Sequence, residues 1–399
     1  MTDNWRQKLM IKTCFVKRTF NGWGCISELP SVVESFNAKN VLIVTDPFLE
    51  QNGTAHRIVQ ILEPLNVRCS INSEVVPEPA IEVGERIVKN SRDQKIDLVI
   101  GLGGGSAIDL AKLVATLTTQ DGNVSEYLNL TGNRKIQNQG LPKIMIPTTS
   151  GTGSEVTNIS VLSLESSKDV IVDDSLLADV VILDPELTIT VPPKVTASTG
   201  VDALTHAIES FVSRYATPIT EGLSLAAIRL ISKSIRIAVK DGSNQQARTD
   251  MSYGSYIAGL AFFNAGCAAV HALAYPLGGQ FHIPHGESNA VLLPYVMSYI
   301  RSSCENKLKE IYKNMGFEVS GLSASEASLK CIKELVNLVR DVGIPQSLQD
   351  FGIPSEAIPS LTSDALLQTR LLDRSPMQLE EADISKIYVA AHQGSKLRG

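Results

Sequence analysis

Three of the six histidines in this chain lie close together, in the segment HALAYPLGGQFHIPHG at residues 271–286. They are His271, His282 and His285, and they span only fifteen residues. A chance cluster is one interpretation. A metal site is another, because neutral imidazole is a common ligand of divalent transition metals. A metal site would require further ligands elsewhere in the chain.

A second segment, GVDALTHAIES at residues 200–210, offers such ligands. Asp202 and His206 are four residues apart, so a helix would place them on one face, one turn apart. Such a pair alone is more often a hydrogen-bonded surface pair. With His271 and His285 it becomes one carboxylate and three imidazoles, a set that suits Fe²⁺ or Zn²⁺ with a position open for a substrate oxygen. His282 is left outside this set, and an exposed position is its simplest interpretation.

A glycine-rich stretch, DLVIGLGGGSAIDLAK at residues 97–112, lies between a predicted strand and a predicted helix. Consecutive glycines allow a tight turn and a close approach of the backbone to a ligand. The start of the next helix offers free N–H groups that suit a pyrophosphate. Ser106 stands where a strict GxGxxG pattern would have its last glycine, so a plain tight turn is the alternative.

Two further features favour a dinucleotide. The loop IPTTSGTGSEVT at residues 146–157 is rich in hydroxyl groups that can bind ribose, phosphate or amide, although such loops are often only solvated turns. Asp46 ends the predicted strand 40–46, where a carboxylate can accept from both ribose hydroxyls and would repel a 2′-phosphate. Asp46 alone could equally be an ordinary turn residue.

The elements that carry these loops alternate in the first half of the chain. Apolar runs predict strands at 40–46, 67–76, 96–102 and 143–148, and amphipathic runs predict helices at 54–65, 80–93 and 107–119. This alternation is typical of a mostly parallel sheet covered by helices. After residues 180–193 helical periodicity dominates. We therefore expect an α/β dinucleotide-binding domain at 1–191 and an all-helical domain at 192–399.

Composition excludes several classes of protein. The net charge is −6 and no run of lysine and arginine occurs, so nucleic acid is not an expected partner. The six cysteines are dispersed without a CxxC pair, which favours reduced thiols in a cytoplasmic protein, and the N-terminal segment lacks the apolar core of a signal peptide. The long apolar segment 256–279 contains Asn264 and His271, so we expect a buried core helix rather than a membrane span.

Four motifs occur in the order and at the spacing of one known family: IGLGGGSAIDLAK, PTTSGTGSEVT, TGVDALTHAIES and HALAYPLGGQFHIPHG. The chain thereby resembles the iron-containing (group III) alcohol dehydrogenases, from about Thr45 to His285 and more loosely beyond. The resemblance implies an active site in the cleft between the two domains, NAD as cofactor, Fe²⁺ as the metal with Zn²⁺ as second choice, and a homodimer or higher homo-oligomer. The implied metal ligands are Asp202, His206, His271 and His285. The implied cofactor contacts are Asp46, Gly103, Gly104, Gly105, Ser106, Thr148, Thr149, Thr152, Lys168 and Leu187.

One departure from the family concerns the proton route. Tyr275 occupies a position that many members fill with histidine. It follows His271 by four residues, so a continued helix would place it on the metal-facing side, but Pro276 disfavours helical geometry there. We expect YPLGG to end the helix that carries His271, and the following loop to return His285 to the same metal. A phenol is a poor base near pH 7, so we expect Tyr275 to orient substrate or nicotinamide, and the proton to leave through water by way of His282.

The expected activity is reversible hydride transfer between NAD(H) and a small alcohol or aldehyde. The apolar stretch 258–270 suggests a channel wall in which Phe262 contacts substrate, although plain core packing explains it equally well. Alternatives are an NAD- and metal-dependent glycerol dehydrogenase or a dehydroquinate synthase-like lyase. The lyase should carry several basic residues near the metal, and the motifs offer only Arg214. A non-catalytic NAD-binding module is a further alternative, which the complete ligand set disfavours.

Overall fold

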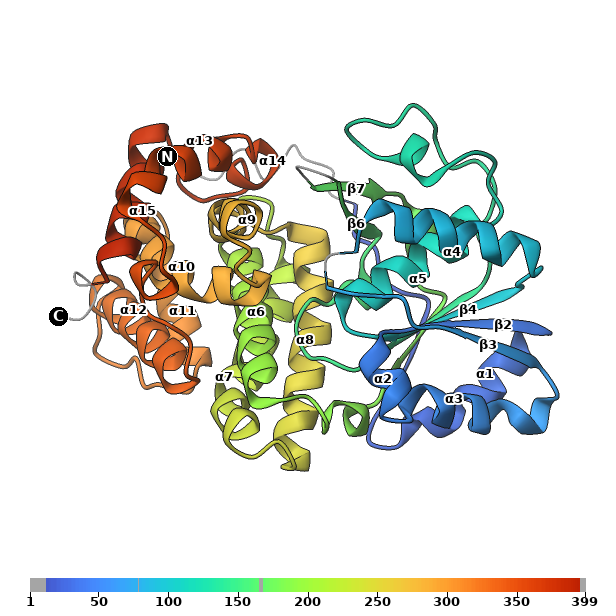
Figure 1. Cartoon of the computed structure of the whole chain (residues 1–399). Helices are drawn as coiled ribbons and strands as arrows, with labels where there is room; N and C mark the ends of the chain where they lie inside the picture. The colour runs from blue at the N-terminus through green and yellow to red at the C-terminus, as the bar shows by residue number, and fades with distance from the viewer. Residues whose placement is uncertain (1–11, 78, 165–167, 395–399) are drawn as a thin grey trace.

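A parallel sheet forms the centre of the first half of the molecule (Figure 1). The computed structural model describes residues 12–77, 79–164 and 168–394. The expectation about the N-terminal segment therefore falls largely on residues 1–11, outside the described residues. The sheet has six strands, and every strand pair in it is parallel. In spatial order they are β1 (Arg18–Asn21), β8 (Val180–Leu183), β5 (Lys143–Pro147), β4 (Leu98–Gly103), β2 (Asn40–Val44) and β3 (Arg68–Asn72).

Helices cover both faces of this sheet because its strands are apolar on both sides. One set of alternate residues, including Val41, Ile43 and Ile100, packs against α1 (Leu29–Ser35) and α3 (Thr54–Leu62). The opposite set packs against α4 (Ile81–Asp93) and α5 (Gly105–Leu117). The short helix α2 (Pro47–Gln51) follows strand β2. Burial on both faces explains the near-continuous apolar runs in the sequence.

The predicted strands and helices of this half are confirmed, with differences at their ends, and α1, α2 and β8 were not predicted. The predicted strand 67–76 stops at Asn72, where polar residues follow on an edge strand. Strand β1 was not predicted, because it is a four-residue, partly exposed edge strand without an apolar run. An antiparallel hairpin of β6 (Ile159–Ser163) and β7 (Lys168–Val172) was also not predicted. Strands β1 and β3 lie at the two edges of the sheet, where burial shapes the sequence least, whereas the buried strand β8 was not separated from the turn residues that follow it.

The second half contains only helices and turns in its described residues and has its own apolar core. Together the two halves confirm the predicted fold class. Its longer helices are α6 (Pro193–Val212), α7 (Pro218–Lys240), α8 (Gln245–Ala265), α9 (Ala269–Phe281), α10 (His285–Ile300), α11 (Glu305–Asn314), α12 (Ala324–Asp341) and α15 (Glu381–Gln393). The shorter helices α13 (Ile358–Leu366) and α14 (Thr369–Leu372) pack beside α9. Helix α6 begins directly after Pro192; the division at 191/192 itself stays a prediction.

The expectation of a single core helix at 256–279 is wrong. Helix α8 ends at Ala265, Gly266 takes a positive φ of 82°, and α9 begins at Ala269 after a bend of 103°. The predicted helix break at YPLGG is also wrong, because Pro276 lies inside α9. Proline removes one helical hydrogen bond, but the buried side chains of α9 anchor the helix in the core on both sides of it.

The long apolar stretch was also examined as a membrane span. Within the described residues, no single helix is long and apolar enough to cross a membrane. The bent pair of α8 and α9 would meet the length and composition requirement only if both helices were taken together.

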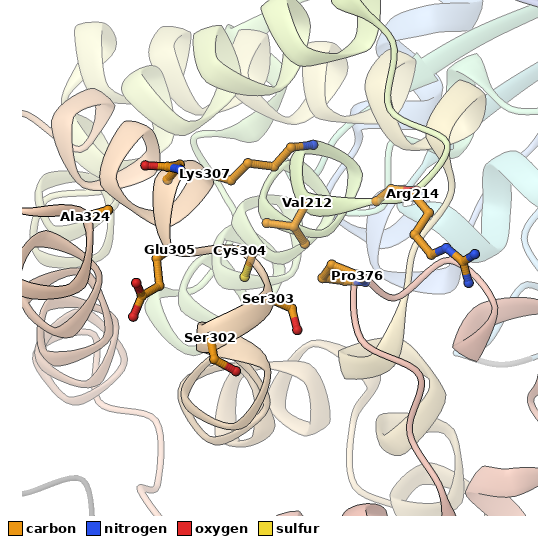
Figure 2. Close-up of a pocket in the computed structure, with 11 residues that line it drawn as sticks. Val212, Arg214, Ser302, Ser303, Cys304, Glu305, Lys307, Ala324 and Pro376 are labelled. Carbon is orange, nitrogen blue, oxygen red and sulfur yellow. The ribbon is translucent and has the colours of Figure 1, made fainter. Parts of the chain in front are cut away.

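A cavity of about 440 Å³ lies in the helical half, beside the start of α11 (Figure 2). Its lining is Val212, Ser213, Arg214, Ser302, Ser303, Cys304, Glu305, Asn306, Lys307, Ala324 and Pro376. None of the predicted site residues belongs to this lining. This cavity is therefore separate from the predicted metal and cofactor residues.

Candidate metal centre and cofactor loops

Three helices bring the four predicted ligand residues together. Asp202 and His206 come from α6, His271 from α9 and His285 from α10. One ligand atom of each residue lies within 4.8 Å of the corresponding atoms of the others. Asp202, His206 and His271 are buried, and the His285 side chain is 36% exposed. The cluster is thus closed on the protein side and open at His285.

The local structure around the histidines differs from the expectation. His271 is the third residue of α9 and therefore lies in its first turn, not near its end. The helix continues to Phe281, and His282 ends it in the left-handed conformation at φ 55°. After Pro284 the chain re-enters a helix, so that His285 is the first residue of α10. Both histidines are thus fixed by helix starts, and only the turn 282–284 separates α9 from α10.

At Asp202 and His206 the shifts in pKa favour the forms that bind a metal. Burial would raise the pKa of Asp202, but the three neighbouring imidazoles and Asn289 hold it below its usual value. Burial lowers the pKa of His206 to about 3, although Asp202 opposes this shift. Its Nδ1 is buried and has no hydrogen-bond partner among the described residues. One carboxylate and three imidazoles, of which His206 is neutral and has an unpartnered ring nitrogen, form a donor set that fits iron or zinc.

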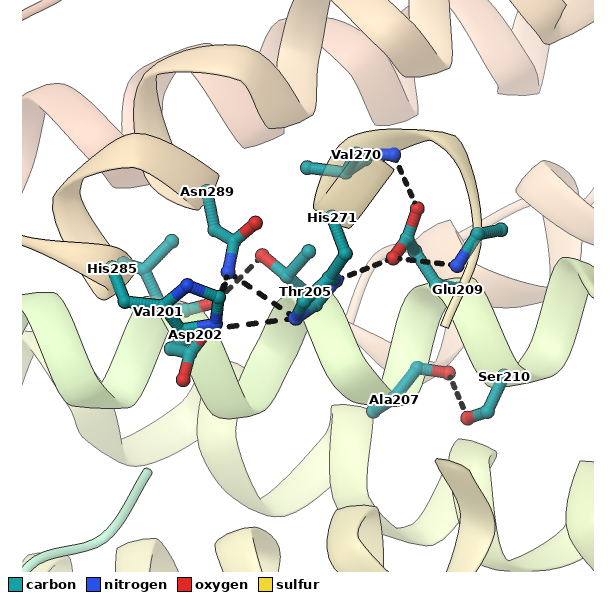
Figure 3. A network of polar contacts seen from close by, with 11 residues as sticks. Val201, Asp202, Thr205, Ala207, Glu209, Ser210, Val270, His271, His285 and Asn289 are labelled. Carbon is teal, nitrogen blue, oxygen red and sulfur yellow. Dashed lines mark hydrogen bonds and ion pairs between the residues drawn. The ribbon is translucent and has the colours of Figure 1, made fainter. Parts of the chain in front are cut away.

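Asn289 is a residue of this site that the sequence did not indicate. It lies one turn after His285 on α10 and is fully buried. Its Nδ2 donates to Oδ1 of Asp202 at 2.7 Å and lies 3.2 Å from Nε2 of His271 and 3.1 Å from Nε2 of His285 (Figure 3). The i, i+4 spacing from His285 was a usable signal once His285 was placed at a helix start.

Glu209 is the second residue that the sequence did not indicate. It lies on α6, is fully buried, and its Oε2 accepts from Nδ1 of His271 at 2.6 Å (Figure 3). Burial would lower the pKa of His271, but Cys267 and Glu209 raise it well above the ordinary value. The signal in the sequence was the spacing of 202, 206 and 209, which continues one stripe of α6.

The glycine-rich turn and the hydroxyl-rich loop pack directly on each other. The turn joins β4 to α5 as predicted, and the backbone N–H of Thr148 donates to the Gly103 carbonyl at 3.0 Å. Gly103 has φ 148°, and a Cβ there would lie 2.7 Å from Cβ of Ala107. A Cβ at Gly105 would lie 2.7 Å from Cγ2 of Thr152. These contacts leave room only for glycine and expose the backbone of the turn at the start of α5.

The remaining residues expected at the turn lie beside it. A Cβ at Gly104 would lie 3.4 Å from Oγ1 of Thr149, and Ser106 follows in the first turn of α5. Asp46 caps α2, since its Oδ1 accepts from the backbone N–H of Leu49 at 3.0 Å. Its other oxygen would lie 3.4 Å from a Cβ at Gly103. A carboxylate is therefore present next to the glycine turn, as the sequence predicted.

The hydroxyl-rich loop also connects the two halves of the molecule. A Cβ at Gly151 would lie 2.6 Å from Cβ of Thr199 on α6, and a Cβ at Gly153 would lie 2.6 Å from Cα of Gly259 on α8. Phe262 of α8 stacks on the His206 ring with centroids 4.2 Å apart. The loop thus lies between the glycine turn and the cluster of the four predicted ligand residues.

Lys112 holds this loop in place and was not singled out from the sequence. It is fully buried on α5, and its Nζ donates to the Ser154 carbonyl at 2.9 Å, to Oγ1 of Thr157 at 3.0 Å and to the Ile159 carbonyl. It also pairs with Asp109 at 3.0 Å. Burial lowers the pKa of Lys112, although Asp109 opposes this shift. The sequence could have indicated this role, because Lys112 is a lysine within an otherwise apolar stripe of its helix.

The residues expected at the proton route are only partly brought together. Tyr275 stays helical in α9 and is 41% exposed, and its ring centroid lies 5.9 Å from that of His285. Burial of the phenol raises the pKa of Tyr275. His282 is exposed at the end of α9 and is not one of the four clustered ligand residues. Tyr275 therefore lies beside the metal cluster, and the structure gives His282 no place in it.

Two expected cofactor contacts lie away from the glycine turn or outside the description. Leu187 is 6% exposed in the 3₁₀ turn Pro185–Thr188 and packs in the core formed with α1 and α3. Lys168 begins β7, but its side chain lies outside the described residues. Neither position adds to the geometry of the cofactor loops.

The sequence matches two family descriptions. Residues 17–185 match "Iron-containing alcohol dehydrogenase", and residues 196–392 match "Fe-containing alcohol dehydrogenase family, C-terminal". The chain belongs to the iron-containing alcohol dehydrogenase family. The long-chain-alcohol dehydrogenase 1 of Geobacillus thermodenitrificans is 59% identical over 374 residues, which cover 94% of this chain and 95% of that protein.

Solved structures of this family share the fold. A 1,3-propanediol oxidoreductase superposes with a TM-score of 0.92 at 35% identity, covering 96% of this chain and all of that one. The sulfoacetaldehyde reductase of Bifidobacterium kashiwanohense, solved in complex with NAD⁺, superposes with a TM-score of 0.87 at 29% identity, covering 97% of this chain and all of that one.

These matches confirm the predicted class of activity. This iron-containing alcohol dehydrogenase is an NAD-dependent oxidoreductase that interconverts alcohols and aldehydes, and its cofactors are NAD and iron. A dehydroquinate synthase-like lyase and a non-catalytic module are not what the matching families describe.

Proposed function

We propose that this enzyme oxidises primary alcohols with an apolar chain, and reduces the corresponding aldehydes, at a single metal held by Asp202, His206, His271 and His285. The observation that carries the proposal is the position of this cluster beside Phe262 and the hydroxyl-rich loop. Fe²⁺ is the proposed ion and Zn²⁺ the second choice. When bound, the metal supplies Lewis-acid polarisation of the alcohol or carbonyl oxygen.

The chain's own residues provide binding and orientation. The backbone of Gly103, Gly104, Gly105 and Ser106 binds the pyrophosphate, and Asp46 accepts from the adenine ribose. Thr148, Thr149 and Thr152 belong to the loop that packs on α6 and α8, and their hydroxyl groups would hold the nicotinamide half of the cofactor. Lys168 and Leu187 remain proposed cofactor contacts on the resemblance alone.

At the reacting end, Phe262 contacts the substrate chain. Its ring lies on His206, so an alkyl group bound near the metal would meet an apolar surface there. Tyr275 orients substrate or nicotinamide from the exposed side of the cluster, and the proton leaves through water with His282 as the exit group. Lys112 holds the loop that these contacts depend on.

The preference for a longer apolar chain has one support outside the site. The relative that is 59% identical is named as a long-chain-alcohol dehydrogenase. The small alcohol expected from the sequence is therefore extended to a longer alkyl chain. We also propose that the enzyme is cytoplasmic and forms a homodimer or higher homo-oligomer. The absence of any disulfide among the six cysteines, all in described positions, supports the first of these proposals.

A substrate panel tests the proposed substrate class. The panel contains primary alcohols of increasing chain length, diols, hydroxy acids and the matching aldehydes, each with NAD(H) and with NADP(H). We expect kcat/KM to rise with alkyl chain length and to be highest with NAD(H). A kcat/KM that is highest for diols or hydroxy acids would overturn the substrate class while leaving the family assignment intact.

A further inference from the structure

We propose that Glu209 is a positioning residue of the metal centre: its carboxylate fixes the His271 imidazole so that Nε2 faces the other three ligands. The proposal rests on the metal set of the proposed function. It adds a residue that contacts neither the metal nor the substrate in this arrangement. Glu209 is therefore expected to act through His271 alone.

The contacts of Glu209 use both of its oxygens. Oε2 accepts from Nδ1 of His271 at 2.6 Å and from the backbone N–H of Ala268 at 3.0 Å. Oε1 accepts from the backbone N–H of Val270 at 2.5 Å. Glu209 is fully buried, and a buried carboxylate is costly unless it is hydrogen-bonded in this way. The three donors account for its presence in an apolar helix stripe.

The first consequence concerns the state of the imidazole. In the neutral, metal-binding form of His271, an Nδ1–H that donates to a carboxylate fixes the tautomer and leaves the lone pair on Nε2. That nitrogen lies 3.8 Å from Oδ1 of Asp202, on the side of the cluster. The ring therefore presents the correct atom to the ion before the ion arrives. Metal binding then requires no rotation of this ring.

The second consequence concerns the backbone that carries the ligand. The N–H groups of Ala268 and Val270 lie at the start of α9, where a helix has no internal acceptors. Ala268 is the N-cap of α9 and supplies no side-chain cap. Glu209 provides the missing acceptors from α6, the helix that also carries Asp202 and His206. It thus fixes the start of α9 relative to the other ligands.

An alternative role for Glu209 is direct coordination of a metal ion. Glu209, Cys267 and His271 also have potential ligand atoms within 4.8 Å of one another, so they could hold a metal themselves. Both oxygens of Glu209, however, already accept from N–H groups, and Nδ1 of His271 is one of the donors. The geometry favours the positioning role. The number of metal ions bound per chain distinguishes this role from direct coordination.

The test measures metal affinity rather than turnover. Metal-free wild type and Glu209→Gln are titrated with Zn²⁺ in competition with a chelator of known affinity, and with Co²⁺, whose visible absorption reports the ligand geometry. We expect the Zn²⁺ affinity of Glu209→Gln to fall by about 10–100-fold and its Co²⁺ absorption to change, because partners of ligating histidines have effects of this size. The stoichiometry should remain one ion per chain.

The matched control is Asp250→Asn. Asp250 is a buried carboxylate of the same helical half that accepts from Lys233 at 3.1 Å and Ser234 at 2.7 Å, away from the ligands. The control should lower thermal stability while leaving the Zn²⁺ affinity within about threefold of wild type. If Glu209→Gln also loses stability but keeps wild-type affinity, Glu209 is only structural and the proposal is overturned. Binding of a second ion in wild type that is lost in Glu209→Gln would support the direct role instead and overturn ours.

A second measurement applies to wild type, so that a variant that fails to fold does not decide the matter. Histidine ¹H–¹⁵N correlation spectra of the Zn²⁺ form should show His271 protonated at Nδ1 and metal-bound at Nε2. Metal binding at Nδ1 would overturn the proposal. If Asp202→Asn binds Zn²⁺ as tightly as wild type, the metal set of the proposed function is itself wrong and the role of Glu209 falls with it. If Asp202→Asn binds Zn²⁺ more weakly than wild type while Glu209→Gln keeps the wild-type Zn²⁺ affinity, only the inference on Glu209 is contradicted.

Discussion

At the scale of single residues, Asn289 is the side chain that touches most of the proposed ligands. It donates to Asp202 at 2.7 Å and lies close to ring nitrogens of His271 and His285. Asn289→Ala removes the donor that orients the Asp202 carboxylate. We expect the Zn²⁺ affinity to fall by about tenfold, because such partners tune the ligand they hold. An unchanged affinity in chelator competition, with Asn314→Ala on α11 as control, would contradict this role.

The cofactor preference is expected to depend on the charge of Asp46. Asp46→Asn removes the charge but keeps an N-cap side chain for α2, so the fold should be unaffected. We expect wild type to prefer NAD over NADP, and the variant to narrow the ratio of the two kcat/KM values, because a 2′-phosphate no longer meets a carboxylate. Equal kcat/KM values for both cofactors in wild type would show that Asp46 does not face the ribose.

The proton route is expected to tolerate the loss of the Tyr275 hydroxyl. The pKa of Tyr275 is raised, so the phenol stays protonated throughout the neutral range and cannot act as a base there. We expect Tyr275→Phe to lower kcat by roughly tenfold or less, and alcohol oxidation by wild type to be fastest in alkaline conditions.

The measurement is kcat against pH for wild type, Tyr275→Phe and His282→Ala. If Tyr275→Phe is inactive at every pH while His282→Ala behaves as wild type, Tyr275 is itself the essential proton-transfer group.

Residue types and spacing were enough to predict that Asp202, His206, His271 and His285 cluster, because Asp202 and His206 share a helix face and the histidines are few. That the cluster binds the metal stays a prediction. Residue types and spacing were not enough for Glu209 and Asn289, whose partners come from other helices. A buried Glu or Asn within a helix is indistinguishable from a surface one until the packing of that helix is known. The same holds for Lys112, which acts on a loop about forty residues further along the chain.

At the scale of elements, the hydroxyl-rich loop is the part that the two halves share. Gly153 has φ 60°, and a Cβ there would lie 2.6 Å from Cα of Gly259 on α8. We expect Gly153→Ala to push the loop away from α8, lower stability by about 1–3 kcal/mol and raise the KM for NAD.

The control for this prediction is Gly222→Ala near the start of α7. Gly222 is exposed, and a Cβ there would contact nothing within 4 Å. Alanine is favoured over glycine in a helix, so this variant should be neutral or stabilised by up to about 1 kcal/mol. Thermal unfolding and NAD kinetics are measured on both. Equal behaviour of the two variants would show that the loop does not depend on close packing against α8.

Elements were predictable where one pattern dominated. The buried strands β2, β4 and β5 and the amphipathic helices α3 and α4 follow directly from their apolar periodicity. The sequence predicts one helix in place of α8 and α9, because the residues on both sides of Gly266 are equally apolar and the apolar pattern contains no break. Pro276 predicted a helix end that does not occur, because core packing of α9 outweighs the one hydrogen bond that the proline removes.

At the scale of the whole molecule, the junction between the halves contains a carboxyl group that should make stability depend on pH. Glu155 is buried beside Lys112, and burial raises its pKa from 4.5 to about 7. A group whose folded pKa is raised stabilises the fold fully below the unfolded value, and this contribution is lost as pH rises through about 7.

We therefore expect Glu155→Gln to unfold at a higher temperature than wild type at pH 8, and the difference to shrink as pH falls toward 4.5. The effect at pH 8 is at most about 3 kcal/mol, on the basis of about 1.4 kcal/mol per pKa unit. The measurement is thermal unfolding of the metal-free protein across this range. A difference between variant and wild type that does not change with pH would show that Glu155 is ionised in the fold at every pH tested.

The most direct test of the whole account is the metal content of the chain together with its activity. Wild type should contain about one divalent ion per chain, lose turnover when a chelator removes it, and regain turnover when Fe²⁺ is returned. His271→Ala and His285→Ala should neither retain the ion nor turn over, whereas His392→Ala, on α15 and bonded only to the Ile353 carbonyl at 3.0 Å, should behave as wild type. Full turnover by a chelated, metal-free preparation would contradict the account.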